Sequence, residues 1–129
     1  MTAGIAGLGL IGGSFAKAYH RANERVLAYN RTRSTLDFAI LSGDVDAELT
    51  PENVSECDII IICLYPEAAA EYLRSIAPYI RKDAIVMDAC GTKRNVCEDG
   101  FRLAESAVCA FLLLKNMALH MWEPIPWQA

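Results

Sequence analysis

Three glycines near the start of the chain, Gly7, Gly9 and Gly12, have the spacing that lets a backbone turn bind phosphate. In a G-x-G-x-x-G turn the first glycine permits a tight bend, the second lets the backbone approach an anion, and the third lets a helix pack closely on a strand. The helix that begins there presents unpaired N–H groups and its positive dipole end. The sequence therefore predicts a nucleotide pyrophosphate here, with contacts from Gly7, Leu8, Gly9, Leu10, Ile11 and Gly12.

The residues after the next predicted strand indicate which cofactor this turn serves. In dinucleotide-binding folds an acidic side chain at this place bonds the ribose 2′-hydroxyl and repels a 2′-phosphate. This chain has Asn30, Arg31, Thr32 and Arg33 there instead. Two guanidinium groups and no carboxylate can pair with phosphate, so these four residues predict NADP rather than NAD. The alternative is that both arginines are solvated loop charges.

Two later turns, at residues 63–66 and 88–93, are expected at the carboxyl edge of the sheet, where ligands bind in open α/β folds. They supply the remaining predicted cofactor contacts, which are Cys63, Leu64, Tyr65, Cys90 and Gly91. Lys93 is a candidate for meeting an acidic substrate, with a solvated lysine as the alternative. For the two cysteines the alternative is an inert buried thiol. No catalytic residue is predicted, and His120 is expected to face solvent.

The elements that must position these residues alternate between strand and helix. Strands are predicted at 3–6, 26–29, 59–63 and 84–88, and helices from the glycine turn to about Asn23, from a Ser34 cap to Leu41, from Pro66 toward Ala77, and over 93–106. The stripe of the first helix is Ile11, Phe15, Ala18 and Tyr19, and that of the second is Leu36, Ala39 and Ile40. Residues 45–49 make at best a poor strand, and Thr50-Pro51-Glu52 is expected to begin one short helical turn.

This order predicts a single α/β domain with a Rossmann-type, doubly wound parallel sheet. The isoleucine run at 59–63 is typical of a centre strand that is buried on both faces. We expect the dinucleotide-binding domain to cover residues 1–106 and an irregular tail to cover 107–129, where no helix or strand period is found.

Composition limits the class of protein further. A length of 129 residues with 53% apolar side chains suits one domain, and a net charge of −4 with scattered Lys and Arg disfavours nucleic acid. Five cysteines without a C-x-x-C pair offer no zinc spacing and are typical of reduced thiols in a cytoplasmic protein. The longest later apolar run, 107–114, is too short to span a membrane, so no membrane partner is expected.

Two segments together, Gly7 to Ala18 and Met87 to Arg94, resemble the prephenate or arogenate dehydrogenases of tyrosine biosynthesis. The resemblance covers residues 1 to about 105. It implies an NAD(P)-dependent oxidoreductase in which hydride leaves the ring carbon bearing the hydroxyl while carbon dioxide departs. It also implies a small-molecule substrate and a homodimeric parent enzyme, with the cofactor-selecting position at Asn30. Gly91 stands where many members have serine.

Family members continue into Gly-Gly-His-Pro-Met-Ala-Gly, whose histidine polarises the substrate hydroxyl, and then into a helical domain. This sequence shows neither, so we expect it to bind cofactor and to be inactive alone. Read from the third base of the Met121 codon, the codons for 121–129 permit Val-Gly-Ala-His-Pro-Met-Ala-Gly. The tail, from about Ala107 or from Ala118 at the latest, is therefore interpreted as out-of-frame sequence of a truncated dehydrogenase. Sequencing the source gene tests this, because a one-base insertion or two-base deletion must restore the motif.

Other interpretations stay open from the sequence. The cofactor domain of a β-hydroxyacid dehydrogenase or imine reductase can also have Asn-Arg-Thr after its second strand. Neither family, however, is expected to have the Asp-Ala-Cys-Gly-Thr-Lys segment found at 88–93. A non-catalytic nucleotide-binding module is the alternative outside the enzyme class.

Overall fold

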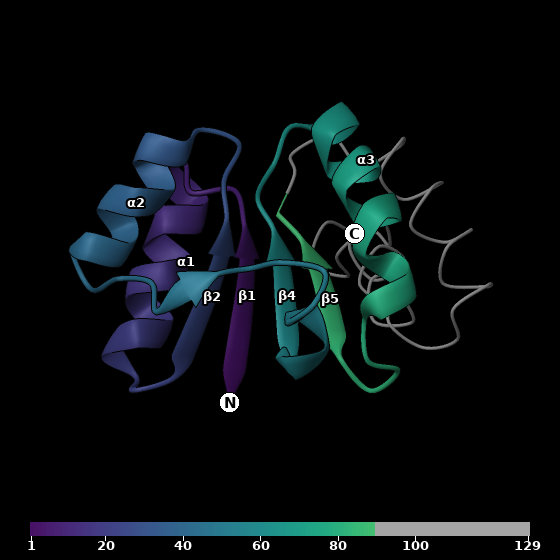
Figure 1. Ribbon diagram of the computed structural model, residues 1–129, viewed down its shortest axis with the longest axis horizontal. Helices are drawn as coiled ribbons and strands as arrows, with labels where there is room; N and C mark the ends of the chain where they lie inside the picture. Colours follow the sequence, from purple (N-terminus) through teal and green to yellow (C-terminus); the bar gives the residue numbers. More distant parts are fainter. Residues whose placement is uncertain (90–129) are drawn as a thin grey trace, which may run out of the picture.

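The structure, a computed structural model, describes residues 1–89. Five strands in them form one parallel sheet in the order β3-β2-β1-β4-β5 (Figure 1). The strands are β1 Thr2–Ala6, β2 Arg25–Tyr29, β3 Ala47–Glu48, β4 Ile59–Ile62 and β5 Ile85–Asp88. The helices are α1 Leu10–Arg21, α2 Arg33–Leu41 and α3 Pro66–Ile76, with short 3-10 helices η1 Val54–Glu56 and η2 Ala77–Tyr79. The predicted α/β fold with a Rossmann-type sheet is confirmed.

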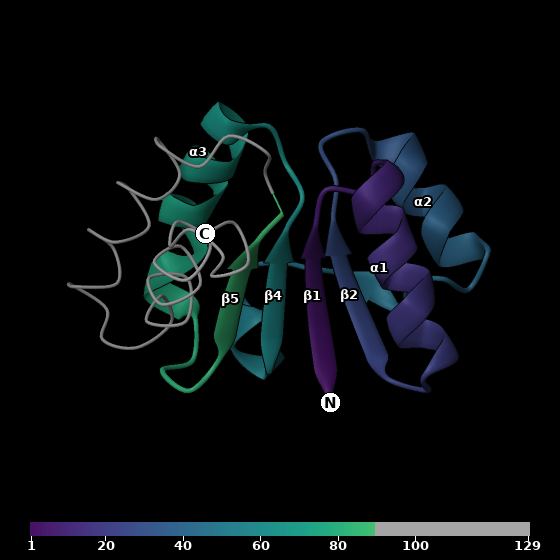
Figure 2. The same cartoon turned by 180° about the vertical axis from the view of Figure 1, so that it is seen from behind.

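Helices cover both faces of this sheet. Figures 1 and 2 show α1 and α2 together on one face and α3 on the other. Each face has its own buried cluster, one beneath α1 and α2 and one beneath α3. The chain is therefore doubly wound, because the crossovers that follow β1 and β4 run on opposite faces.

The isoleucines of β4 link the two cores. Ile59 and Ile61 point into the cluster beneath α1 and α2, whereas Ile60 and Ile62 point into the cluster beneath α3. Successive side chains of a strand alternate between faces, so a strand with helices on both sides needs an unbroken apolar run. Each such side chain contributes about 1.5–3 kcal/mol through burial. The strand is interior as predicted, but the middle position of the described sheet belongs to β1.

The first turn of α3 follows its sequence closely. Pro66 is the first helical residue, where its missing N–H costs nothing, and Tyr65 is the N-cap. The side chains buried on its inner face recur at helical spacing and are Ala69, Ala70, Leu73 and Ile76. Pro78 lies in η2 directly after the helix, as the predicted stop requires.

The buried face of α1 differs from the predicted stripe. Ile11 is 54% exposed and Ala18 is exposed, while Gly12 and Ala16 are buried, with Phe15 and Tyr19 partly buried. The reason is the close packing of Gly12 on the turn before the helix, which fixes how α1 is rotated about its axis.

Two predicted helix starts also need correction. The N-cap of α2 is Thr32 and not Ser34, because the helix already begins at Arg33. The Thr50-Pro51-Glu52 segment forms a turn, and the short helix follows it at η1. The Asn53 side chain accepts a hydrogen bond from the Thr50 N–H at 2.8 Å and donates one to the Glu48 carbonyl at 2.9 Å. These two bonds stabilise the turn that precedes η1.

Two further observations bear on the remaining expectations. The predicted strand at 84–88 is buried at Val86, while Ile85 is 36% exposed. Among residues 1–89 no helix is long and apolar enough to cross a membrane. Several expectations lie outside the described part of the chain. They are the helix over 93–106, the domain end at 106, the tail over 107–129, and the residues Cys90, Gly91, Lys93 and His120.

Candidate functional site

The carboxyl ends of β1 and β4 form the place where the sheet changes its direction of winding. The chain leaves β1 toward α1 on one face and leaves β4 toward α3 on the other (Figure 1). In open α/β sheets such a topological switch point leaves a crevice in which ligands bind. The glycine turn at 7–9 follows β1 into this crevice.

The glycine turn allows no side chain at two of its positions. Gly7 has φ +97°, and a Cβ there would lie 2.6 Å from the carbonyl oxygen of Cys63. A Cβ on Gly12 would lie 1.7 Å from the carbonyl oxygen of Gly7. The Gly7 N–H donates to the carbonyl of Tyr29 at 2.7 Å, which ties the turn to the end of β2. Close packing of turn, strand and helix thus explains both glycines.

Gly9 is different, because the space around it is open. A Cβ there would meet no atom within 4 Å. Gly9 is the N-cap of α1, and the first turn of that helix has no acidic residue and no side-chain cap. The first N–H groups of α1 therefore face an open space. Because Gly9 has no side chain, nothing from this residue fills that space. This cradle fits a pyrophosphate at the positive end of the helix dipole.

Asn30 braces this turn from the neighbouring loop. Its Oδ1 accepts the N–H of Leu8 at 2.9 Å, and its Nδ2 donates to the carbonyl of Thr32 at 3.0 Å. The side chain therefore joins the glycine turn to the loop that leads into α2. This positioning role is additional to the cofactor-selecting role that the sequence predicted.

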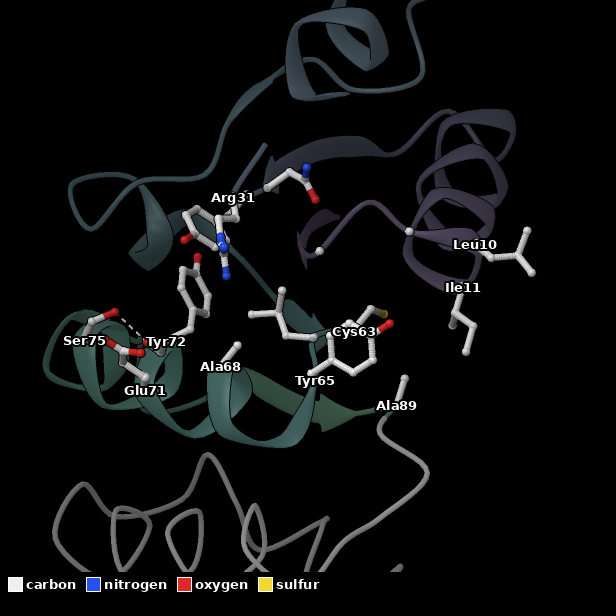
Figure 3. A pocket seen from close by; sticks show the side chains of 15 residues that line it. Leu10, Ile11, Arg31, Cys63, Tyr65, Ala68, Glu71, Tyr72, Ser75 and Ala89 are labelled. Atoms are coloured by element: carbon white, nitrogen blue, oxygen red, sulfur yellow. Dashed lines mark hydrogen bonds between the residues drawn. The ribbon is translucent and has the colours of Figure 1, made fainter. Parts of the chain in front are cut away.

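A cavity of about 850 Å³ opens beside the turn and extends along α3 (Figure 3). This volume lies in the range of small-molecule and cofactor sites. Nine predicted residues line it: Gly7, Gly9, Leu10, Ile11, Asn30, Arg31, Cys63, Leu64 and Tyr65. Six lining residues were not predicted, and they are Tyr29, Ala68, Glu71, Tyr72, Ser75 and Ala89.

Four other predicted residues do not line the cavity. Leu8 packs on the core beneath α1, and Gly12 is buried in the turn. Thr32 occupies the N-cap position of α2, but its side chain makes no hydrogen bond to that helix. Arg33 is engaged by Asp37 and Glu48, with Nε 3.0 Å from Asp37 Oδ1 and Nη1 2.7 Å from Glu48 Oε2.

Two tyrosines form one wall of the cavity. The rings of Tyr29 and Tyr72 stack with centroids 4.3 Å apart and planes 20° from parallel. The Tyr72 hydroxyl is buried and has no hydrogen-bond partner among the described residues. Burial raises the pKa of Tyr72, so the hydroxyl is protonated at neutral pH and available as a donor. Figure 3 shows Arg31 and Tyr72 pointing into the same cavity.

The sequence did not indicate Tyr72 as a site residue, because a tyrosine in a helix is ordinarily interpreted as a packing residue. A usable signal was present, since Ala68, Tyr72 and Ser75 have the i, i+4, i+7 spacing of one helix face that begins near the carboxyl edge. The orphaned hydroxyl, however, is visible only in the folded chain.

The two described cysteines have different surroundings. Cys63 is partly buried and lines the cavity. Cys57 is fully buried, and its burial raises the pKa of the thiol to about 11, so it stays protonated and unreactive. Within residues 1–89 no group of three or more His, Cys, Asp or Glu side chains could hold a metal ion.

The sheet order, the glycine turn and the cavity together define a dinucleotide-binding domain. A family model described as the NAD binding domain of 6-phosphogluconate dehydrogenase matches residues 2–112, which is most of the chain. The chain belongs to this family, and it is an NAD(P)-binding domain of the dehydrogenase and reductase class.

Solved structures with this fold come from several enzymes. Arogenate dehydrogenase from Synechocystis is 28% identical with a TM-score of 0.74, over 80% of this chain and 37% of that one. Prephenate dehydrogenase from A. aeolicus, in complex with hydroxyphenyl propionate and NAD+, is 21% identical with a TM-score of 0.70, over 84% and 38%. An imine reductase from Streptomyces aurantiacus is 23% identical with a TM-score of 0.69, over 81% and 38%. The chain thus spans well under half the length of these enzymes.

Proposed function

We propose that the domain binds NADP in preference to NAD. The observation that carries this proposal is Arg31, which follows β2, points into the cavity and makes no hydrogen bond or ion pair with another described residue (Figure 3). A guanidinium without a protein partner can form two parallel hydrogen bonds with a phosphate. An NAD-preferring site would hold a carboxylate at Asn30 instead.

The start of α2 supports the same proposal. This helix of nine residues begins directly after the Arg31-Thr32 pair, and its first turn contains no acidic residue. Its unpaired N–H groups and positive dipole end favour an anion there. The Thr32 hydroxyl is not used as a cap and can donate to the same anion.

The rest of the cofactor would follow the crevice. The pyrophosphate would be held by the cradle at Gly9, and the ribose and nicotinamide would lie against Cys63, Leu64 and Tyr65. Cys90 and Gly91 belong to the same proposed set but lie outside the described residues. When bound, NADP supplies the acceptor for a hydride from the substrate.

Calorimetric titration with NADPH and NADH tests the proposal. We expect NADPH to bind at least tenfold more tightly, because one charge-assisted contact contributes about 1.5–3 kcal/mol and tenfold in Kd is about 1.4 kcal/mol. Arg31→Ala should weaken NADPH binding by about tenfold or more and leave NADH binding unchanged. Arg21→Ala is the matched control, since this exposed arginine lies in the last turn of α1, away from the glycine turn. Equal affinity of the unsubstituted chain for both cofactors would contradict the proposal.

For the reaction, we propose oxidative decarboxylation of arogenate or prephenate by the parent enzyme. The 28% identity with an arogenate dehydrogenase and the segment from Asp88 to Lys93 support this substrate class. The codons of residues 121–129, which permit a histidine motif in another frame, support a truncated parent whose fragment binds cofactor without turnover.

A second candidate is a β-hydroxyacid dehydrogenase, which is favoured by the family model of 6-phosphogluconate dehydrogenase. Spectrophotometric assays of NADP reduction distinguish the two candidates. With the reading frame restored, we expect turnover of arogenate or prephenate and none of 6-phosphogluconate. We expect no turnover by the 129-residue chain itself. Oxidation of 6-phosphogluconate would favour the second candidate, and unaided turnover of arogenate or prephenate would show that the fragment is active.

A further inference from the structure

The two arginines on either side of Thr32 have different surroundings. Arg31 lines the cavity and is unpaired among the described residues. Arg33, the first residue of α2, pairs through Nε with Asp37 of the same helix and through Nη1 with Glu48 of β3. The sequence alone does not distinguish them, because the two arginines are only two residues apart and the contact of Arg33 with Glu48 forms only in the folded chain.

The pairing removes the positive charge of Arg33 from the loop. One guanidinium faces two carboxylates, so the three groups together carry one net negative charge at neutral pH. The contact with Glu48 is the main cause that raises the pKa of Arg33, as expected for a guanidinium that faces carboxylates. Arg33 therefore offers an incoming phosphate neither a free charge nor its Nε donor.

We propose that Glu48 and Asp37 are specificity-determining residues, which weaken 2′-phosphate recognition by holding Arg33 away from it. This inference rests on the proposed NADP preference and assigns that preference to Arg31 alone. Arg31 and Arg33 are two residues apart, so their Cα atoms lie within about 7 Å of each other. Both side chains therefore start from neighbouring backbone, and the charges around Arg33 act on an anion bound by Arg31 where they come within the Debye length of about 8 Å at physiological salt.

A purely structural role for these ion pairs is the competing explanation. The Arg33 side chain is 64% exposed and its partners are 50% and 40% exposed. Ion pairs this exposed contribute little to stability, because water and salt screen them and both long side chains lose freedom. Neutralising the carboxylates should therefore leave the fold intact, so a change in cofactor binding can be measured on folded protein.

The test is the double variant Asp37→Asn/Glu48→Gln, which keeps side-chain size and removes both charges. Calorimetry should show NADPH binding that is about fivefold tighter than in the unsubstituted chain, with NADH binding unchanged. The gain should shrink at high salt. Arg33→Ala should weaken NADPH binding slightly in the unsubstituted chain, because both carboxylates then lack a counter-charge, and should have the larger effect in the double variant, where it should remove most of the gain.

The matched control is Glu56→Gln/Asp83→Asn. These two carboxylates also pair with arginines, but they precede β4 and β5 at the opposite edge of the sheet. The inference is overturned if the double variant leaves the NADPH affinity unchanged, tightens NADH equally, or if Arg33→Ala has the same effect in both backgrounds. A failure of the unsubstituted chain to prefer NADPH would instead overturn the proposed NADP function, so the two failures are distinguishable.

Discussion

Position 12 illustrates how a single residue decides whether the turn can exist. A Cβ there would lie 1.7 Å from the Gly7 carbonyl oxygen, which is backbone and cannot move aside without opening the turn. The neighbouring glycine at position 13 also lies in α1, but a Cβ there would meet no atom nearer than the Leu8 oxygen at 3.9 Å. The two glycines thus have different reasons to be there, although the sequence shows them side by side.

This difference gives a prediction with an internal control. Gly12→Ala should destabilise the fold by about 3 kcal/mol and remove measurable NADPH binding, because turn and helix must separate. Gly13→Ala should stabilise it by about 0.5–1 kcal/mol, since alanine is the better helix former and has room. Urea unfolding and NADPH titration of both variants are the measurements. Similar stability and binding for both would show that the turn is not packed as described.

At the scale of elements, the amino ends of the strands are joined by one carboxylate. Asp58 Oδ2 accepts the N–H of Thr2 at 2.7 Å, and Oδ1 accepts a hydrogen bond from Arg81 Nη2 at 2.7 Å. The contact with Arg81, followed by that with the Thr2 N–H, lowers the pKa of Asp58. The side chain therefore ties the start of β1 to the start of β4 and to the turn before β5, on the edge opposite the cavity.

A depressed carboxyl pKa gives this link a defined pH dependence. Its stabilising effect is complete above the unfolded pKa of about 3.9 and is lost as the pH falls through the lower folded pKa. Asp58→Asn should therefore lower the Tm at pH 7, and the difference from the unsubstituted chain should shrink as the pH is lowered below about 4. Thermal unfolding across this range is the measurement, with the more exposed Asp83→Asn as a control. A difference in Tm that is the same at every pH would contradict this assignment.

At the scale of the whole molecule, the cavity exists because two halves of the sheet wind in opposite directions. One wall comes from the turn after β1 and the end of β2, and the other comes from the end of β4 and the face of α3 (Figure 3). Neither half contains the cavity by itself. A ligand that contacts both walls would therefore hold the two halves together and stabilise the fold as a unit.

Much of this architecture was predictable because its causes are local. The isoleucine run of β4, the proline that begins α3 and the glycines at positions 7 and 12 each follow from backbone sterics or from periodicity within a few residues. The order of elements then left a doubly wound parallel sheet as the expected arrangement, and the structure has it. Nine of the predicted cofactor contacts line the cavity, because parallel strands bring their carboxyl ends to one edge of the sheet.

Other features were decided by tertiary packing alone. The rotation of α1, which exposes Ile11 and Ala18, is fixed by the contact of Gly12 with a turn. The Tyr72 hydroxyl is buried without a partner among the described residues only once α3 packs on the sheet, and Arg33 meets Glu48 only when α2 and β3 come together. Within residues 1–89, sequence by itself determined the order of the strands and longer helices and where a phosphate-binding turn belongs, because those depend on neighbours along the chain. Only the folded structure decided which arginine faces the cavity, because that depends on charges brought together from separate elements.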